Sequence, residues 1–411
     1  MTAGVDAPEP FRLGINYWPA RTAMRWWTSF DEAETAEDFE RIAAAPFDSI
    51  RVFLLWEAFQ PEPEHIDPEM LERLVTVANL ARDAGLHLMP TLFTGHMSGV
   101  DWIPGWALGG AERDARFRVV SGGRVVEHGL RNWYLDDDVV RAQALFARRA
   151  AEALAGHDAL WAWDLGNENS NCVVPAHREL ARRWLSQMTS AIRAADGLAE
   201  VTIGIHMEDL EEDRRLGPHE AAEACDFLTM HGYPIYARWA RGGTDAALVP
   251  FLARVTRWLG GGADVLFSEF GLPTYRDGDP GVEPGGSPPL IEEVEAAEYV
   301  LRVLPGLREA GATGAMLWCY SDYHPATFAH PPLDEAVHER SFGLWRADGS
   351  PKPALDVVRS FAGATRLPVP DREPWIDIDA ERYWERPEVE LPRLYDRFLA
   401  MAAAGDVSGA G

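Results

Sequence analysis

The feature that most constrains this chain is a regular alternation of short apolar runs with helical patterns. Eight runs of four to eight residues predict parallel strands buried on both faces, because such strands carry apolar residues throughout. These runs cover residues 13–17, 49–55, 86–92, 160–165, 201–206, 227–231, 265–268 and 314–318. Helical patterns separate or follow them at 31–45, 68–84, 137–155, 176–195, 219–224, 246–259, 292–310 and 351–361.

Eight strand–helix repeats predict an α/β fold, a closed (β/α)₈ TIM barrel. An open doubly wound sheet is the alternative, but it usually carries a glycine-rich turn after its first strand, and GINYWPA is not such a turn. Two long connections, 93–136 and 319–350, leave the face of the barrel where active sites form. We expect a catalytic barrel over 1–365 and an extension over 366–411, packed on the barrel to residue 401 and disordered over its last ten residues.

Charge and composition exclude several classes of protein. The chain has 65 acidic and 38 basic residues, and its net charge of −27 disfavours nucleic acid and anionic membranes as partners. No apolar run is long enough to span a bilayer, and the first residues resemble no secretory signal, so we expect a cytoplasmic protein. No cysteine or histidine spacing indicates a metal site, and GHMSG does not match a serine nucleophile elbow, so we expect no metal and no cofactor.

Two carboxylates stand at the ends of opposed strands. Asn167 and Glu168 end the fourth predicted strand in WAWDLGNEN, and Glu269 ends the seventh in VLFSEF. Strands four and seven face each other across the mouth of a barrel, so both carboxylates can point into one cavity. Glycoside hydrolysis uses such a pair, one group to protonate the leaving oxygen and the other to attack or to activate water.

Other strand residues fit the same site. Arg51 lies within the second strand, where a buried cation needs a carboxylate partner. An arginine beside Glu269 would keep that carboxylate ionised, although a purely structural ion pair is the alternative. His231 and Tyr233 end the sixth strand, and Trp318 ends the eighth, where it could lie under a sugar ring or simply pack in the barrel.

The ordered set of these residues resembles clan A glycoside hydrolases, and family 5 in particular. The set is Arg51, Asn167-Glu168, His231-x-Tyr233, Glu269 and Trp318. The resemblance implies a retaining mechanism with Glu168 as acid/base and Glu269 as nucleophile. It further implies that Asn167 binds the sugar 2-hydroxyl and that Arg51 and Tyr233 support the nucleophile. Trp318 would line the −1 subsite, and His96 is the best match to a histidine that often follows strand three.

Within that family, the loop segments NYWPARTAMRWW, FLLWEAFQPEP and PTLFTGHMSGVDWIPGW are most similar to bacterial β-mannosidases. This resemblance implies hydrolysis of terminal β-1,4-mannosides, including Man-β-1,4-GlcNAc. Trp102, Trp106 and Trp133 would wall a closed pocket, with the acceptor sugar near Asn169. An endo-β-1,4-mannanase or cellulase, and a carbohydrate-binding barrel without activity, stay open as alternatives; the oligomeric state is not indicated.

The proposed pair also makes two physical predictions. A retaining mechanism requires the two carboxyl groups to lie about 5 Å apart, whereas inversion requires about 6.5 Å or more. Glu168 must be protonated near neutral pH, so its pKa should exceed the ordinary value of about 4.3, raised by the charge of Glu269.

Overall fold

A computed structural model describes residues 9–109, 116–276, 286–369 and 372–408. Eight parallel strands form one sheet in the order β11-β10-β3-β2-β1-β16-β13-β12. Their bounds are β1 (Arg12–Tyr17), β2 (Ser49–Phe53), β3 (His87–Phe93), β10 (Ala162–Asn167), β11 (Glu200–Gly204), β12 (Leu228–His231), β13 (Val265–Phe270) and β16 (Gly314–Leu317).

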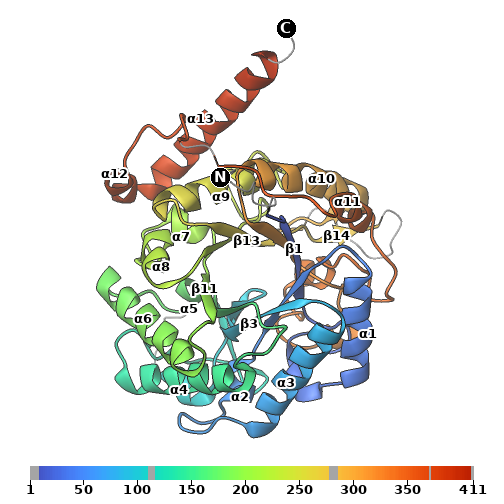
Figure 1. The fold of residues 1–411 in the computed structure, drawn as a ribbon, viewed down its shortest axis with the longest axis vertical. Helices are drawn as coiled ribbons and strands as arrows, with labels where there is room; N and C mark the ends of the chain where they lie inside the picture. Colours follow the sequence, from blue (N-terminus) through green and yellow to red (C-terminus); the bar gives the residue numbers. More distant parts are fainter. Residues whose placement is uncertain (1–8, 110–115, 277–285, 370–371, 409–411) are drawn as a thin grey trace, which may run out of the picture.

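The two outer strands of that order, β11 and β12, close the barrel. The His231 amide donates to the Ile205 carbonyl at 2.9 Å, and the Met207 amide donates to the His231 carbonyl at 3.0 Å. Figure 1 shows the strands ringed by helices. The predicted (β/α)₈ TIM barrel is therefore confirmed.

One helix follows each barrel strand on the outside of the barrel. These helices are α1 (Glu32–Ala43), α3 (Pro68–Asp83), α4 (Asp137–Leu154), α6 (Arg178–Ala195), α8 (Pro218–Ala224), α9 (Leu248–Leu259), α10 (Glu293–Glu309) and α11 (Ala354–Ser360). Aspartates begin three of them, because a carboxylate satisfies the free amides of a first helical turn: Asp31, Asp67 and Asp136 accept from residues of α1, α3 and α4.

The inside of the barrel is filled by side chains from several strands. Met89, Leu266 and Met316, from β3, β13 and β16, belong to one fully buried apolar cluster. Gly14 on β1 makes room for it, because a Cβ there would lie 2.5 Å from the Met316 methyl carbon. The barrel is thus a packed core, and a substrate can enter only above it.

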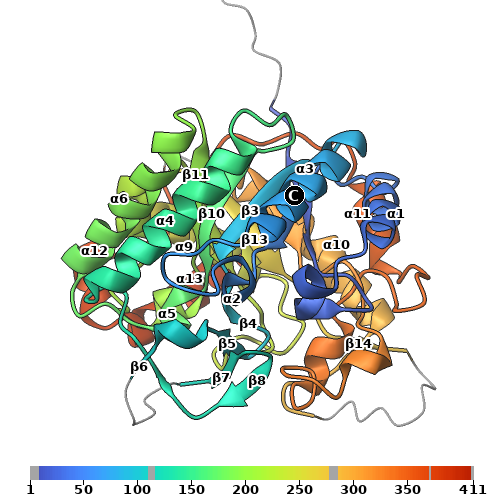
Figure 2. The same cartoon turned by 90° about the horizontal axis from the view of Figure 1, so that it is seen from below.

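The connection after β3 forms structure of its own. Strands β4 (Gly95–Met97), β5 (Val100–Trp102), β7 (Arg118–Ser121) and β8 (Arg124–Val126) make a small sheet in that order, and β6 (Leu108–Gly109) pairs with β9 (Gly129–Leu130). Figure 2 shows the small sheet at the same end of the molecule as β14 (Thr274–Tyr275), which pairs with β15 (Ile291–Glu292).

Short helices complete the loops at the barrel mouth and its surroundings. They are α2 (Trp56–Phe59), α5 (Asn169–Cys172), α7 (Glu208–Glu211) and the 3₁₀ turns η1 (Ala23–Ser29), η2 (Gly105–Ala107), η3 (Pro325–Thr327) and η4 (Val337–Ser341). Both η3 and η4 belong to the second long connection, 319–350. No helix among the described residues combines the length and the apolar character needed to cross a bilayer.

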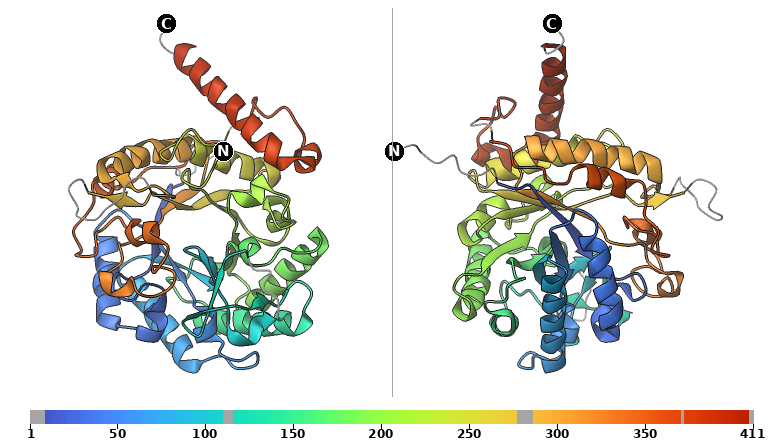
Figure 3. Two further views of the ribbon diagram at one scale, coloured as in Figure 1. Left: turned by 180° about the vertical axis from the view of Figure 1, so that it is seen from behind. Right: turned by 45° about the vertical axis from the view of Figure 1, so that its right-hand side comes forward.

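The C-terminal segment carries α12 (Ala380–Glu385) and α13 (Pro387–Ser408). The Tyr383 hydroxyl donates to the Leu210 carbonyl at 2.6 Å, and the Tyr395 ring packs on Phe251 of α9 with centroids 4.9 Å apart. Figure 3 shows the far half of α13 leaving the barrel. Residues 402–408 continue α13, and residues 409–411 lie outside the described residues; the disorder expected for the last ten residues stays a prediction.

Candidate active site

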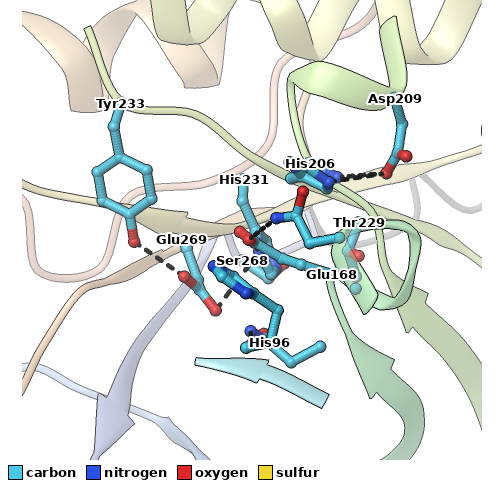
Figure 4. A network of polar contacts seen from close by, with 12 residues as sticks. His96, Glu168, His206, Asp209, Thr229, His231, Tyr233, Ser268 and Glu269 are labelled. Carbon is cyan, nitrogen blue, oxygen red and sulfur yellow. Dashed lines mark hydrogen bonds and ion pairs between the residues drawn. The ribbon is translucent and has the colours of Figure 1, made fainter. Parts of the chain in front are cut away.

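Glu168 and Glu269 meet above the carboxyl ends of β10 and β13 (Figure 4). Glu269 lies within β13, and Glu168 follows the last residue of β10 with a positive φ of 49°, in the left-handed region that side chains usually avoid. One carboxylate oxygen of each residue and Nδ1 of His231 all lie within 4.8 Å of one another. The barrel therefore brings together the two carboxylates that the sequence placed on opposed strands.

The Glu168 carboxyl group is held by one contact at each oxygen. Nδ1 of His231 lies 3.0 Å from Oε1, and Nδ2 of Asn171 donates to Oε2 at 3.1 Å. Burial raises the pKa of Glu168 to about 7, and the charge of Glu208 adds to this, against the opposing charges of His96 and Arg51. The direction agrees with the prediction, but the main cause is burial and not the charge of Glu269.

The Glu269 carboxylate has stronger partners. Arg51 Nη1 lies 2.5 Å from Oε1, and the Tyr233 hydroxyl donates to Oε2 at 2.8 Å. Burial raises the pKa of Glu269, whereas His231, Arg51 and the Tyr233 hydrogen bond lower it. Arg51 thus acts in the expected direction but does not by itself outweigh the burial of the carboxylate.

Arg51 is fully buried and neutralised from two sides. Besides Glu269, it donates to Asp164 Oδ2 through Nη2 at 2.6 Å and through Nε at 3.0 Å. Its Nη2 also donates to Asn167 Oδ1 at 2.8 Å, and its Nη1 donates to Asn16 Oδ1 at 3.2 Å. Asp164 was not among the predicted site residues, although an aspartate inside the apolar run WAWDL is the partner that a buried arginine requires.

The loop after β3 reaches the same site. Nδ2 of Asn167 donates to the backbone carbonyl of His96 at 2.5 Å, and Nδ1 of His96 lies 2.8 Å from Oδ1 of Asp101. Burial opposes protonation of His96, but the hydrogen bond and charge of Asp101 outweigh it and raise the histidine pKa. His96 therefore stands beside Asn167, and Asp101 is its partner, a residue that was not among the predicted site residues.

Trp318 follows β16 and is buried at the same end of the barrel. Its ring meets Phe53 of β2 edge-on, with centroids 5.8 Å apart. Phe53 also lies under the guanidinium group of Arg51, 4.5 Å from its Cζ atom. The Phe53 ring thus contacts both Trp318 and the guanidinium group that pairs with Glu269.

Asn169 and the loop tryptophans are mostly buried and pack against neighbouring residues. Trp106 and Trp133 pack edge-on against Trp56, and the Trp102 indole donates to the Met97 carbonyl at 3.3 Å. The contacts of Trp106 and Trp133 join the loop to α2, and that of Trp102 lies within the β4–β5 hairpin; their role as pocket walls stays a prediction. Asn169 is 2% exposed, and its amide fills the space beside Gly95 and Gly166; its place near the acceptor sugar stays a prediction.

Ion pairs join the loops around the mouth. Arg118 of β7 makes a two-pronged contact with Asp334 at 3.1 and 2.9 Å, which joins the loop after β3 to the loop after β16. Arg116 makes a similar contact with Glu208 at 2.6 and 2.7 Å, which joins it to the loop after β11. Ion pairs therefore join the loop after β3 to the loops after β11 and β16.

Solved structures of other proteins resemble this chain, whereas comparison of its sequence with family models and curated proteins finds no match. The exo-β-1,4-mannosidase Op5Man5 from Opitutaceae bacterium strain TAV5 is 27% identical, with a TM-score of 0.71 over 87% of this chain and 60% of that chain. The chain thus spans less than two thirds of the length of that relative.

Two structures of GH5_18 from Streptomyces cattleya match over nearly the whole chain. One, in complex with GlcNAc, is 23% identical with a TM-score of 0.79 over 97% of this chain and 92% of that chain. A glutamate-to-alanine variant in complex with Manβ1-4GlcNAc is 23% identical with a TM-score of 0.77 over 96% and 92%. The predicted resemblance to family 5-like enzymes of clan A, and to bacterial β-mannosidases, is confirmed.

Proposed function

We propose that this protein is a retaining glycoside hydrolase that removes terminal β-linked mannose, with Glu269 as nucleophile and Glu168 as acid/base. The observation that carries the proposal is the pair itself, with carboxylate oxygens within 4.8 Å of each other. An oxygen-to-oxygen distance of at most 4.8 Å favours the roughly 5 Å separation of retaining enzymes over the roughly 6.5 Å or more of inverting enzymes.

The first step forms a covalent glycosyl-enzyme. A carboxylate oxygen of Glu269 bonds to the anomeric carbon as the bond from that carbon to the leaving oxygen breaks, and Glu168 gives its proton to that oxygen. The environments match these roles, because burial keeps Glu168 protonated up to about pH 7. Arg51 and Tyr233 both donate hydrogen bonds to Glu269, which favours its charged form.

The second step releases the sugar. Glu168, now a carboxylate, takes a proton from water while the water oxygen bonds to the anomeric carbon, and the ester bond to Glu269 breaks. Both groups return to their starting protonation states. Asn167 and Trp318 are assigned to the sugar of the −1 subsite, as the family resemblance implies, and the reaction uses no metal and no cofactor.

His231 connects the two carboxylates. Its Nδ1 lies 3.0 Å from Glu168 and 3.5 Å from Glu269, and burial lowers the histidine pKa to about 4. The ring is therefore neutral at working pH, and an N–H at Nδ1 can donate to whichever carboxylate is charged in a given step. This fits a reaction in which negative charge moves from Glu269 to Glu168.

The preference for a chain end and for mannose has two supports. The loops after β3 and β16 are joined across the mouth by Arg118 and Asp334, which favours a pocket over an open cleft. Op5Man5 is named an exo-β-1,4-mannosidase, and the Streptomyces cattleya variant holds Manβ1-4GlcNAc. An oligosaccharide with a terminal β-mannosyl residue is the substrate that agrees with both the joined loops and the similar mannosidase structures.

A panel of 4-nitrophenyl β-glycosides tests this proposal directly. We expect turnover of the β-mannoside above that of the β-glucoside and β-galactoside, with β-mannose as the first product in proton NMR and free mannose released from the start of mannan-oligosaccharide hydrolysis. First release of α-mannose would contradict retention. Loss of mannan viscosity without free mannose would indicate the endo-acting alternative, and binding without turnover would indicate an inactive barrel.

A further inference from the structure

Two buried side chains, Asn171 and Arg214, form a chain of contacts that ends at the second oxygen of Glu168. Asn171 lies in α5, and its backbone amide donates to the Glu168 carbonyl at 2.9 Å. This tight turn carries the Asn171 side chain back to the Glu168 carboxyl group, where Nδ2 donates to Oε2 at 3.1 Å. Asn171 is 6% exposed and Arg214 is 5% exposed, so water competes little for these contacts.

Arg214 lies in the connection after β11 and holds the other end of the Asn171 amide. Its Nη1 donates to Asn171 Oδ1 at 2.8 Å, and its Nη2 donates to Glu208 Oε2 at 2.6 Å. Its Nε donates to the exposed Glu212 at 3.3 Å, and Nη1 of Arg116 reaches the same Asn171 oxygen at 3.4 Å. Asn171 Oδ1 therefore faces two guanidinium groups, of which that of Arg214 is the closer.

These neighbours allow the Asn171 amide one orientation. A guanidinium group has donors and no acceptor, so it can bind the amide oxygen but not the amide NH2 group. If the amide were turned over, Nδ2 would face the N–H groups of Arg214, and Oδ1 would face an oxygen of Glu168. Arg214 therefore keeps the NH2 group of Asn171 directed at Glu168. A donor at Oε2 favours the charged form of the Glu168 carboxyl group, into which that group passes when it gives up its proton.

Charged and titratable groups from several elements surround Glu168. Its neighbours by charge or contact are His96 of β4, Arg51 of β2, His231 of β12, Glu269 of β13, Glu208 of α7 and Arg214. The charge of Glu168 also acts on Asp209, Cys172, Tyr233 and Tyr236. Burial is the main cause of the raised pKa of Glu168, and the charge of Arg214 opposes it, together with those of His96 and Arg51. Arg214 thus acts on Glu168 both through Asn171 and through its own charge.

We propose that Asn171 and Arg214 are positioning residues of the acid/base group: Arg214 fixes the Asn171 amide, and that amide holds the Glu168 carboxyl group in place for proton transfer. This rests on the function proposed above and adds two residues to it. No hydrogen bond or ion pair within the described part of the chain joins Asn171 or Arg214 to Glu269. Their loss should therefore slow a reaction whose leaving oxygen needs a proton, and spare one whose leaving group departs without it.

The test uses two substrates that differ in this need, the disaccharide Manβ1-4GlcNAc and 2,4-dinitrophenyl β-mannoside. Loss of a hydrogen bond to a group that becomes charged should lower turnover of the disaccharide about 10-fold or more in Asn171→Ala and in Arg214→Gln. The burst of dinitrophenol should keep the parent rate in both variants. Arg214→Lys keeps a cation with donors only and should recover most of the loss. Arg215→Gln, on the neighbouring exposed side chain, should change nothing.

The alkaline limb of kcat/KM for the disaccharide gives a second reading. Because the charge of Arg214 lowers the pKa of Glu168, Arg214→Gln should move this limb to higher pH, whereas Arg214→Lys should return it toward the parent position. A purely structural loss would lower the rate without moving the limb in this direction.

The outcomes separate this inference from the proposed function. A parent enzyme inactive on every β-glycoside overturns the function. With an active parent, equal losses of disaccharide turnover and of the burst in Asn171→Ala and Arg214→Gln, or no loss in either, overturn only the positioning role. No recovery in Arg214→Lys, or an unmoved alkaline limb in Arg214→Gln, overturns the part assigned to Arg214. Thermal unfolding of each variant confirms that the comparison is made on folded protein, and Asn171→Ala supplies the reading if Arg214→Gln fails to fold.

Discussion

Arg51 places one guanidinium nitrogen 2.5 Å from Glu269 and another 2.6 Å from Asp164, so one buried cation is shared between two buried carboxylates. Asp164 also accepts from the backbone amides of Gly166 and Gly204, at 3.2 and 2.9 Å. The aspartate is thereby fixed in the barrel wall, and it fixes Arg51 in turn. The position of Glu269, the proposed nucleophile, thus depends on Asp164 through Arg51.

Replacing Asp164 by Asn should lower both stability and activity. Removal of one partner of a buried ion pair costs about 3–5 kcal/mol, and we expect the lower end because Glu269 still pairs with Arg51. Urea unfolding measures this loss. Asp83→Ala breaks the exposed contact with Arg82 and should change stability by less than about 1 kcal/mol. An equal loss of stability in Asp164→Asn and Asp83→Ala would mean that the buried Arg51–Asp164 pair contributes no more than an exposed ion pair.

Replacing Glu168 by Ala should affect substrates according to their leaving groups. Formation of the glycosyl-enzyme needs a proton only when the leaving oxygen is basic, so turnover of an unactivated disaccharide should fall about 10³-fold or more. A 2,4-dinitrophenyl β-mannoside should still release its phenol in a rapid burst. Glu269→Ala should abolish the burst as well, because it removes the nucleophile. A burst in Glu269→Ala would contradict the nucleophile role of Glu269. Absence of a burst in Glu168→Ala would contradict the acid/base role of Glu168.

The pH dependence of kcat/KM should follow the two carboxyl groups. Activity requires protonated Glu168, so the rate should fall as pH rises through about 7, the pKa of this group. It should also fall at low pH as Glu269 takes up a proton. Because the charge of Glu208 raises the pKa of Glu168, Glu208→Gln should move the alkaline limb to lower pH. Glu212→Gln, on the neighbouring exposed side chain, should leave it in place.

The strands could be predicted to within two residues of their ends because a buried parallel strand must be apolar on both faces. The meeting of Glu168 and Glu269 could be predicted from these strands, since a closed barrel brings the ends of opposed strands together. The pattern of a single strand does not show which side chain points inward, and for that reason Asp164 was missed. The sequence likewise could not show that Trp133 packs on Trp56, because an aromatic residue in a loop suits a pocket wall and a loop core equally well.

The raised pKa of Glu168 also has a consequence for stability. In the folded protein the pKa is about 7, whereas in the unfolded chain it is near the ordinary value of about 4.3. Between these two values the folded state binds more protons than the unfolded state. The free energy of unfolding therefore falls as pH rises through this window and stays reduced above pH 7.

Replacing Glu168 by Gln should accordingly stabilise the protein at high pH. Gln keeps the shape of the side chain and an oxygen that accepts from Asn171, but it has no charge to bury. We expect Glu168→Gln to exceed the parent protein by up to about 3 kcal/mol at pH 8 and to equal it at pH 4, measured by urea unfolding at both values. Glu64→Gln, an exposed change of the same kind, should alter neither. Equal stability of Glu168→Gln and the parent at pH 8 would show that the Glu168 carboxyl group ionises in the folded protein without cost, and the acid role would lose its physical basis.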